Sequence, residues 1–424
     1  MSGSHHVREW LLSAARSPRL AAALATAGIG VVVAAHLIEN LIGWPGLAAM
    51  LATTVVLAAV SLVARRSEIE WHGLLPISLL AFVAWCTMSI GWSQYTSATL
   101  LGVLYQLTVG FIGLYVALVR DVIQILRAVG DVLRLALGLS LFLEVLSGVL
   151  LDVPIPFLGI QGSIATGGPI QGIFETRNLL GFMALLALVT FSVEFATRSV
   201  QRSTAVASLV VAALMLGFSR SPVTGAVLVL LAAAVVALAG IRRLPHERRM
   251  TAQLFLGGAA VVTGVIVLLA RNAVVNLLSA GSELEYRLGL WRRVEFLADL
   301  NNLEGWGWIG YWRRSFPFTA LRGEGGRLND SALSAYVDAW FQVGLVGVAL
   351  LVVLLALATV RAWLLASTQL SVVYVWPALA IILVAATSLA ESYALVEVGW
   401  LLVVIVAVKS SQRWSWRQRL TAGA

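Results

Sequence analysis

The sequence has little charge and almost no cysteine. Charged residues make up 12% of its 424 residues, about half the share in an ordinary globular chain, while apolar and aromatic residues make up 60%. So few polar side chains cannot cover a water-facing surface, which excludes a soluble enzyme and a disordered chain. The one cysteine, Cys86, lies in an apolar run without a partner, which excludes a disulfide scaffold and thiol redox chemistry. The mean hydropathy of +0.91 indicates an integral membrane protein.

Long apolar runs recur along the chain. A hydrocarbon core about 30 Å thick takes roughly 20 helical residues to cross. The first run is too long for a cleaved signal peptide, and an even number of spans places both termini on one side. The sequence therefore predicts an all-α polytopic membrane protein with about twelve transmembrane helices, near residues 20–38, 46–64, 74–92, 98–118, 133–151, 178–195, 203–219, 223–240, 252–270, 341–360, 372–390 and 394–409.

The basic residues predict the orientation of these spans. If the N-terminus is cytoplasmic, 19 of the 29 lysine and arginine residues fall in inner segments. Outside one long outer segment, only Arg177 and Arg220 then fall on the outer side. Because the positive-inside rule discounts long loops, we expect both termini in the cytoplasm. The net charge of +8 fits this topology, and no basic face on a soluble unit indicates nucleic-acid binding.

The spans divide the chain into three parts. Residues 1–270 contain the first nine helices and a Gly/Pro-rich outer loop at 152–177. Residues 271–340 form one long extracytoplasmic loop, and residues 341–424 contain the last three helices and a basic cytoplasmic tail. Within the long loop, helical spacing predicts an amphipathic helix that lies at the membrane interface, with its apolar face formed by Leu284, Leu288, Trp291, Leu297 and Leu300.

Neither a metal nor a cofactor is expected. The five histidines are too scattered for two of them to pair as ligands at useful spacing. Residues 305–310, GWGWIG, have the glycine spacing of a dinucleotide-binding loop. They lack the preceding strand and the βαβ unit that such a loop needs, so they predict a tight turn instead.

The two arginines on the outer side, Arg177 and Arg220, are the clearest functional signal. Charge at the membrane boundary is costly and tends to mark function. A guanidinium group binds phosphate oxygens through two hydrogen bonds and keeps its proton, which suits a diphosphate whose charge grows as it leaves. The alternatives are that both arginines reach toward lipid headgroups, or that Arg220 caps helix carbonyls.

Five motifs occur in a recognisable order between residues 85 and 405. They resemble those of the O-antigen ligase and polysaccharide polymerase superfamily of bacterial envelope glycosyltransferases. Each motif alone is degenerate, and the likeness lies in their order, spacing and side of the membrane. The motifs are WSQYTSATLLGVLYQLTVG, GIFETRNLLGFMALL, GFSRSPVTGAVL, YRLGLWRRVEFLADLNNLEGWGWIGYW and YVDAWFQVGLVGVALLVVLL.

The resemblance implies a C-type glycosyltransferase architecture, with the long outer loop roofing a lateral cleft. Such an enzyme of the bacterial inner membrane takes a glycan from polyprenyl (undecaprenyl) diphosphate. It passes the glycan, with inversion at the anomeric carbon, to the hydroxyl of a glycan or lipid acceptor, usually without a metal. Polymerase and ligase activities remain equally open, as does the identity of the sugar.

The resemblance also implies roles for individual residues. Arg220 matches the Ser-Arg position, and Arg287 with Trp291 matches the Arg-x-x-x-Trp position. Both arginines would hold the diphosphate and stabilise it as it leaves. Substrate binding would fall to Arg177, Asn178, Trp291 and Asp338, of which Asn178 opens the sixth span and Asp338 lies at the junction between the long loop and the tenth span.

One position departs from the family pattern. Many members carry His-Asn where this chain has Leu333 and Ser334, and the long loop contains no histidine. A carboxylate could act as the base, and Asp330 is favoured over Asp338 because it lies just ahead of the missing pair. Alternatively, little base is needed, or the chain is an altered member.

Two other functions remain open from the sequence. Arg134 and Glu144 lie within predicted spans and could line the path of a transporter or a flippase of lipid-linked glycan. The sequence has no repeated half to support that function. A non-catalytic scaffold of an envelope assembly machine is the third hypothesis, and the absent histidine favours it.

Overall fold

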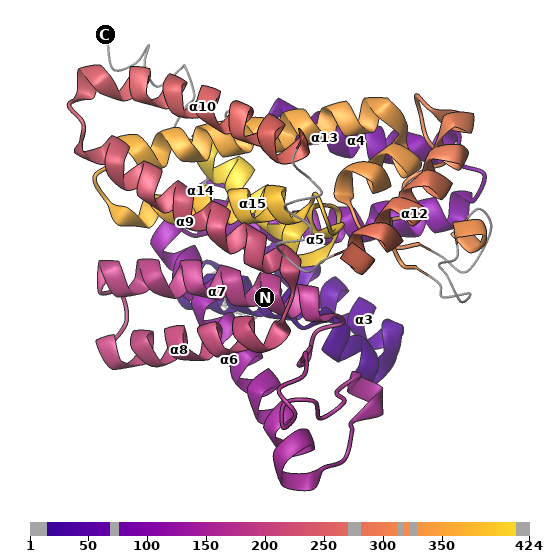
Figure 1. Ribbon diagram of the computed structural model, residues 1–424, viewed down its shortest axis with the longest axis horizontal. Coiled ribbons are helices and arrows are strands. Elements are labelled where there is room, and N and C mark those ends of the chain that lie inside the picture. Colours follow the sequence, from indigo (N-terminus) through magenta and orange to yellow (C-terminus); the bar gives the residue numbers. More distant parts are fainter. Residues whose placement is uncertain (1–14, 68–75, 270–280, 313–317, 322–328, 413–424) are drawn as a thin grey trace, which may run out of the picture.

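The computed structural model describes residues 15–67, 76–269, 281–312, 318–321 and 329–412 (Figure 1). Within these residues the protein is helical and contains no β-strand, only an isolated bridge between Ile155 and Ile160. The predicted basic tail lies almost entirely in 413–424, outside the described residues. The all-α class predicted from the sequence is confirmed for the described part of the chain.

Among the described residues most helices are joined by short connections, and residues 152–176 form a longer one. In chain order, the described helices begin with α2 (Pro18–Val33), α3 (Ala35–Ala64), α4 (Ile77–Met88), α5 (Thr96–Val119), α6 (Val122–Val145) and α7 (Arg177–Thr197). They are followed by α8 (Arg202–Ser219), α9 (Pro222–Arg243), α10 (His246–Leu269), α12 (Gly281–Ala298), α13 (Ala335–Thr368), α14 (Val375–Thr387) and α15 (Glu397–Gln412).

Seven of the described helices are long and apolar enough to cross a membrane. They are α3, α5, α6 with its extension to Leu151, α7, α8, α9 and α13. Large apolar side chains such as Val229, Val236 and Phe255 are exposed along the bundle, as expected for a surface that faces lipid. Each of the twelve predicted spans overlaps a helix. The protein therefore has the architecture of a polytopic membrane protein, and the number twelve stays a prediction.

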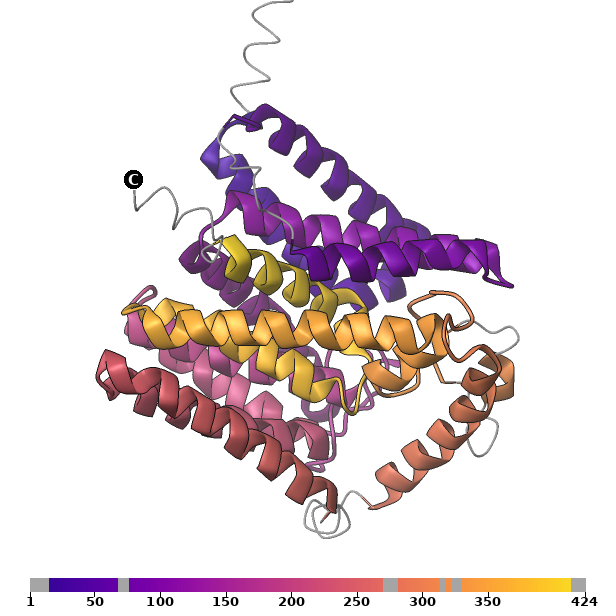
Figure 2. The same cartoon turned by 90° about the horizontal axis from the view of Figure 1, so that it is seen from above.

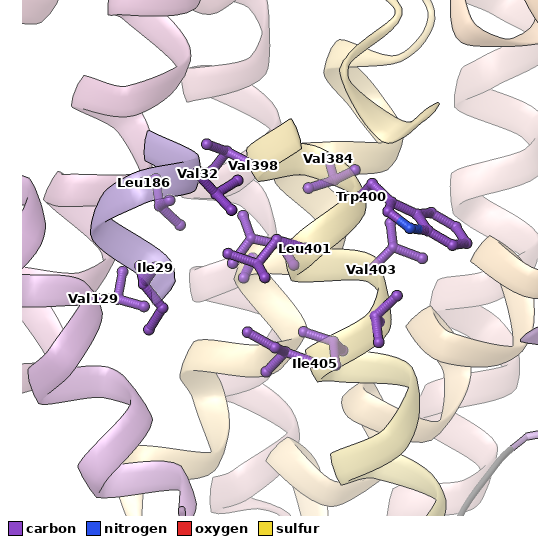
Figure 3. Close-up of a cluster of buried hydrophobic side chains, with 14 of the residues drawn as sticks. Ile29, Val32, Val129, Leu186, Val384, Val398, Trp400, Leu401, Val403 and Ile405 are labelled. Atoms are coloured by element: carbon purple, nitrogen blue, oxygen red, sulfur yellow. The ribbon is translucent and has the colours of Figure 1, made fainter. Parts of the chain in front are cut away.

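The core of the bundle surrounds α15. Every residue from Val398 to Val408 is buried, because α2, α5, α13 and α14 pack around this helix. Figure 3 shows side chains of α15, such as Leu401, facing Ile29 and Val32 of α2, with Val129 and Leu186 beside them. A helix that is apolar on all sides can be buried on all sides, which makes α15 the central element of the fold.

The structure differs from the predicted boundaries where glycine or proline bends a helix. Residues 35–64, labelled α3, are two helical stretches that meet at a break, because Gly43 has a non-helical φ of 74° two residues before Pro45. The tenth predicted span begins at residue 341, whereas α13 begins at Ala335 and bends at Gly344, which has a φ of 69°. Asp338 is therefore in the first turn of a helix rather than at its junction with the loop.

Helix α12 lies across one end of the bundle. Figure 2 shows it at an angle to the long helices, beside the first turns of α13. It coincides with the amphipathic helix predicted in the long loop. Residues 152–176 and the first turn of α7 contribute to the same end, since they line a cavity together with α12. We call this end of the molecule the α12 end.

The GWGWIG segment, residues 305–310, packs against the bend of α13. The amides of Trp306 and Gly307 donate to the carbonyls of Phe341 and Gln342 at 3.1 and 2.7 Å. A side chain at Gly305 would lie 2.5 Å from the backbone nitrogen of Gly344, so both glycines are required by close backbone approach. Residues 305–310 follow an irregular path with positive φ at all three glycines, whereas the hydrogen-bonded turn lies just before them, at 302–304.

Candidate functional site

Three cavities lie side by side at the α12 end. The first, which we call the arginine cavity, has a volume of about 520 Å³ and is lined by Arg177, Asn178, Glu283, Arg287 and Glu391, among others. The second, the junction cavity, has about 220 Å³ and is lined by Tyr286, Asp330, Glu391 and Tyr393, among others. The third, the acidic cavity, has about 540 Å³ and is lined by Glu39, Trp44, Tyr105, Asp330 and Glu397, among others.

Arg287 reaches the arginine cavity from α12. Arg287 is only 7% exposed. Its guanidinium donates to the carbonyl of Leu333, at 2.9 Å, and to the carbonyl of Ala390. It also forms an ion pair with Glu391 at 2.9 Å. This one side chain thus joins the long loop to the connection between α14 and α15. It also places a positive charge at the cavity, where the family resemblance implies a diphosphate-binding arginine.

Glu391 lies between two of the predicted site residues. Its Oε1 accepts from Arg287 and, at 2.6 Å, from Nδ2 of Asn178 at the start of α7. Burial raises the pKa of Glu391, and the charge of Arg287 and the two hydrogen bonds oppose that rise. The side-chain oxygen of Asn178 is buried and has no hydrogen-bond partner among the described residues.

Arg177 occupies the first position of α7. The side chain of Thr176 caps this helix by accepting from the amide of Leu179 at 3.1 Å, which fixes where the helix begins. The guanidinium of Arg177 pairs with Glu283 of α12, and both side chains are partly exposed, at 37% and 28%. Arg177 and Arg287 therefore line the same cavity, each paired with a glutamate.

Arg220 lies at the edge of this arrangement. It ends α8 in the left-handed conformation, with a φ of 46°, and its side chain is exposed. Its Nη2 would lie 3.4 Å from a side chain built at Gly167, in the loop that contributes Ser163 and Pro169 to the wall of the arginine cavity. Arg220 does not line that cavity, and it forms no ion pair within the described residues.

Asp330 and Trp291 have different surroundings. Asp330 is exposed and lines the junction and acidic cavities, while its carbonyl accepts from the amide of Trp312 at 2.8 Å. Trp291 donates from Nε1 to the carbonyl of Ala332 at 2.8 Å and lines none of the three cavities. Its contact supports the backbone that passes through Leu333.

Asp338 is part of a buried network that holds residues 309–312 against α13. It is fully buried, and its Oδ1 accepts from Nε1 of Trp312 at 2.7 Å and from Nε2 of Gln342 at 2.9 Å. The Oε1 of Gln342 in turn accepts from the amides of Ile309 and Gly310. Asp338 lines none of the three cavities, so this geometry favours a supporting role.

Leu333 lies where the family resemblance predicted a histidine. It has a positive φ of 52°, which is uncommon for a leucine, and it lines both the arginine and the junction cavities. Its carbonyl accepts from Arg287 at 2.9 Å. Strained backbone of this kind tends to occur at functional sites. The position is therefore in the site, but with an apolar side chain.

Sequence reasoning missed three glutamates of this site. Glu283 and Glu391 pair with the arginines, and Glu175 lines all three cavities. A signal was present for Glu391, because it is a charged residue in the short connection between two apolar runs. Glu175 lies two residues before Arg177, in the motif GIFETRNLLGFMALL. Its charge beside a predicted membrane boundary was the signal that could have identified it.

No group of three or more His, Cys, Asp or Glu side chains within the described ranges could hold a metal ion. No protein-family model and no curated protein matches the chain.

Proposed function

We propose that this protein is a membrane glycosyltransferase. It moves a glycan from polyprenyl (undecaprenyl) diphosphate to an acceptor hydroxyl, with inversion and without a metal or cofactor, as a member of the superfamily that its motifs resemble. In this proposal the α12 end faces outward from a bacterial inner membrane, and both termini are cytoplasmic. The donor, a glycan or lipid acceptor and the bilayer are its partners, and nucleic acid is not.

The observation that carries the proposal is the convergence of Arg177, Asn178 and Arg287 on one cavity. These residues come from two segments more than 100 positions apart in sequence, and both segments reach the same end of a bundle of apolar helices. A cavity of about 520 Å³ is within the range of ligand sites. Guanidinium groups at one end of a bundle of apolar helices suit a phosphate group carried on a membrane lipid.

Each arginine has a distinct part in the proposed reaction. Arg287 is buried and held by three acceptors, so it presents a fixed positive charge where the leaving diphosphate gains negative charge. Arg177 is more exposed and exchanges partners more readily. Arg220, next to the loop that walls the cavity, would contact the diphosphate from its open side.

The glutamates of the arginine cavity set a condition on donor binding. In the described part of the chain, four glutamates and two arginines line it, namely Glu144, Glu175, Glu283, Glu391, Arg177 and Arg287. A diphosphate therefore has to replace an existing partner of an arginine. The partly exposed pair of Arg177 and Glu283 is the one that exchanges at least cost, because its charges are already partly hydrated.

A transporter or flippase has less support. That hypothesis placed Arg134 and Glu144 along one path. In the structure Glu144 lines the arginine cavity, whereas Arg134 pairs with Glu194 and Asp131 and lines a separate cavity. A non-catalytic scaffold remains the alternative that the experiment below separates from an enzyme.

The test is a transfer assay with purified protein in liposomes. The donor is the undecaprenyl-diphosphate-linked glycan extracted from cells that lack the protein, and the acceptor is a membrane extract of the same cells. Replacing Arg287 by alanine should lower the transfer rate about 100- to 1000-fold, since it removes a donor to leaving-group charge. Arg292→Ala, an exposed arginine on the same helix, is the matched control. Wild-type protein that transfers nothing, or an Arg287→Ala variant as active as the control, would overturn the proposal.

A further inference from the structure

Glu175 lies where the three cavities meet. Among the residues that the structure describes, it is the one that lines the arginine, junction and acidic cavities together. It precedes α7 by two residues, so the capped start of that helix fixes its backbone, while its side chain is exposed. No hydrogen bond or ion pair within the described residues holds its carboxylate. The group is thus accessible from every part of the site.

On one side Glu175 faces the residues proposed to hold the donor. The charged groups of the arginine cavity are Arg177, Arg287, Glu144, Glu283 and Glu391. Both arginines are engaged by glutamates other than Glu175. Its carboxylate can therefore act on a second substrate without giving up a contact that positions the first.

On the other side Glu175 faces a chamber suited to a hydroxyl-rich molecule. The acidic cavity combines aromatic walls with hydrogen-bond acceptors, the combination that sugar rings require. Trp44, Tyr105, Tyr311 and Trp312 supply the aromatic groups. Among the described residues, the charged and titratable side chains that line this cavity and the junction cavity with Glu175 are His36, Glu39, Asp330, Glu391 and Glu397, with the hydroxyls of Tyr105, Tyr286, Tyr311 and Tyr393.

We propose, on the basis of the proposed function, that Glu175 is the catalytic base. It takes the proton from an acceptor hydroxyl that enters through the acidic cavity and meets the donor at the arginine cavity. A carboxylate with access to both cavities can take the catalytic role of the histidine that the family resemblance predicted at position 333.

In the proposed step the acceptor hydroxyl attacks the anomeric carbon of the donor. The acceptor oxygen forms a bond to the anomeric carbon while that carbon loses its bond to the diphosphate oxygen. The hydroxyl proton moves to the carboxylate of Glu175, and the bonding electron pair leaves with the diphosphate, whose added charge Arg287 stabilises. The protonated Glu175 then releases its proton to water in the junction cavity.

The other carboxylates are placed less well for this step. Asp330 lines the junction and acidic cavities but not the arginine cavity, so it does not reach the donor side. Asp338 lines none of the three, and Trp312 and Gln342 occupy one of its oxygens. Glu391 is buried and committed to Arg287 and Asn178.

The electrostatic surroundings of Glu175 support this role. Partial removal of water by the cavity walls, together with the nearby charges of Asp330, Glu39 and Glu391, raises its pKa to about 7. A base works best when its pKa is near the working pH. Because the carboxylate must be deprotonated to act, the transfer rate should rise with pH and level off above 7. At pH 6 it should be about tenfold below the plateau, given a pKa one unit higher.

The experiment measures transfer between pH 5.5 and 8.5 for wild type, Glu175→Gln and Glu175→Asp, with the donor and acceptor used for Arg287. Glu175→Gln should lower the plateau about 100-fold or more and remove the rise near pH 7. Glu175→Asp should recover part of the rate with the rise retained. Glu285→Gln, an exposed glutamate of α12 outside the three cavities, is the control. A Glu175→Gln variant with the wild-type plateau, or with the same rise near pH 7, would overturn the proposal.

Binding of undecaprenyl diphosphate separates this proposal from the proposed function. Glu175→Gln should bind it as tightly as wild type or more tightly, because the variant removes a negative charge beside the arginines. Normal binding with lost transfer supports the base. Normal binding with full transfer refutes the base and leaves the enzyme assignment intact. Wild-type protein that neither binds the diphosphate nor transfers glycan refutes both.

Discussion

Arg287 and Glu391 form a buried ion pair at 2.9 Å although 104 residues separate them in sequence. The pair connects α12, which lies across the end of the bundle, to the connection that precedes the central helix α15. Both side chains are less than 10% exposed. A buried pair of this kind holds its partners in one geometry, and loss of either partner leaves an uncompensated charge.

The first prediction follows from this burial. Glu391→Ala should destabilise the protein by about 3–5 kcal/mol, since Arg287 would remain buried without its counter-charge. The double variant Glu391→Ala, Arg287→Ala should lose less than the sum of the single variants. The measurement is a denaturant titration in detergent micelles, read by alkylation of Cys86, the only cysteine of the chain and fully buried. Strict additivity of the two single losses would contradict the coupling.

The second prediction concerns the exchange of partners at Arg177. Glu283→Gln should tighten binding of undecaprenyl diphosphate, because the diphosphate no longer competes with a carboxylate for Arg177. The pair is partly exposed, so the gain should be at most about fivefold, the equivalent of 1 kcal/mol. Glu285→Gln on the same helix is the control and should leave the affinity unchanged. Weaker binding by Glu283→Gln would show that Glu283 supports the site rather than blocking it.

The third prediction separates the charge of Arg220 from its backbone. Arg220 has a left-handed conformation that glycine adopts without strain, so Arg220→Gly should leave the free energy of unfolding unchanged or raised. Loss of its guanidinium should lower transfer about 10- to 100-fold if it contacts the donor. Arg198→Gly is a close control, because Arg198 ends α7 with a φ of 53° and lines none of the three cavities. Equal transfer by the two variants would remove Arg220 from the site.

Much of the fold could be predicted because it depends on local pattern. Apolar runs of about 20 residues predict helices whatever their neighbours are, and each predicted span overlaps one. The boundaries that differ are those set by tertiary contact. The predicted span starts at residue 341, where the apolar run starts, and so it leaves out the first two turns of α13. Tyr336 and Asp338 in these turns are polar, but their hydrogen bonds hold them toward the protein interior.

The candidate site could be predicted only in part, since its pairings are not local. Charge at the membrane boundary marked Arg177, and the family resemblance marked Asn178 and Arg287, which line one cavity. Charge at the membrane boundary is as costly for a carboxylate as for an arginine, so the same argument would have identified Glu175 and Glu391. No sequence pattern indicates that Glu391 lies between Asn178 and Arg287, because that contact depends on how α7, α12 and α14 pack.

The fourth prediction tests the support of the site by the bend in α13. A side chain at Gly344 would lie 2.1 Å from the carbonyl oxygen of Leu303, and its φ of 69° disfavours any residue with a Cβ. Gly344→Ala should therefore lose about 1–3 kcal/mol to overpacking and about 1 kcal/mol more to backbone strain. Gly217→Ala is the opposite control, because Gly217 lies within α8 with nothing near its missing side chain, and alanine there should stabilise by about 0.5–1 kcal/mol. Alkylation of Cys86 under denaturant measures both, and a Gly344→Ala variant as stable as wild type would mean that the turn at 302–304 does not depend on this contact.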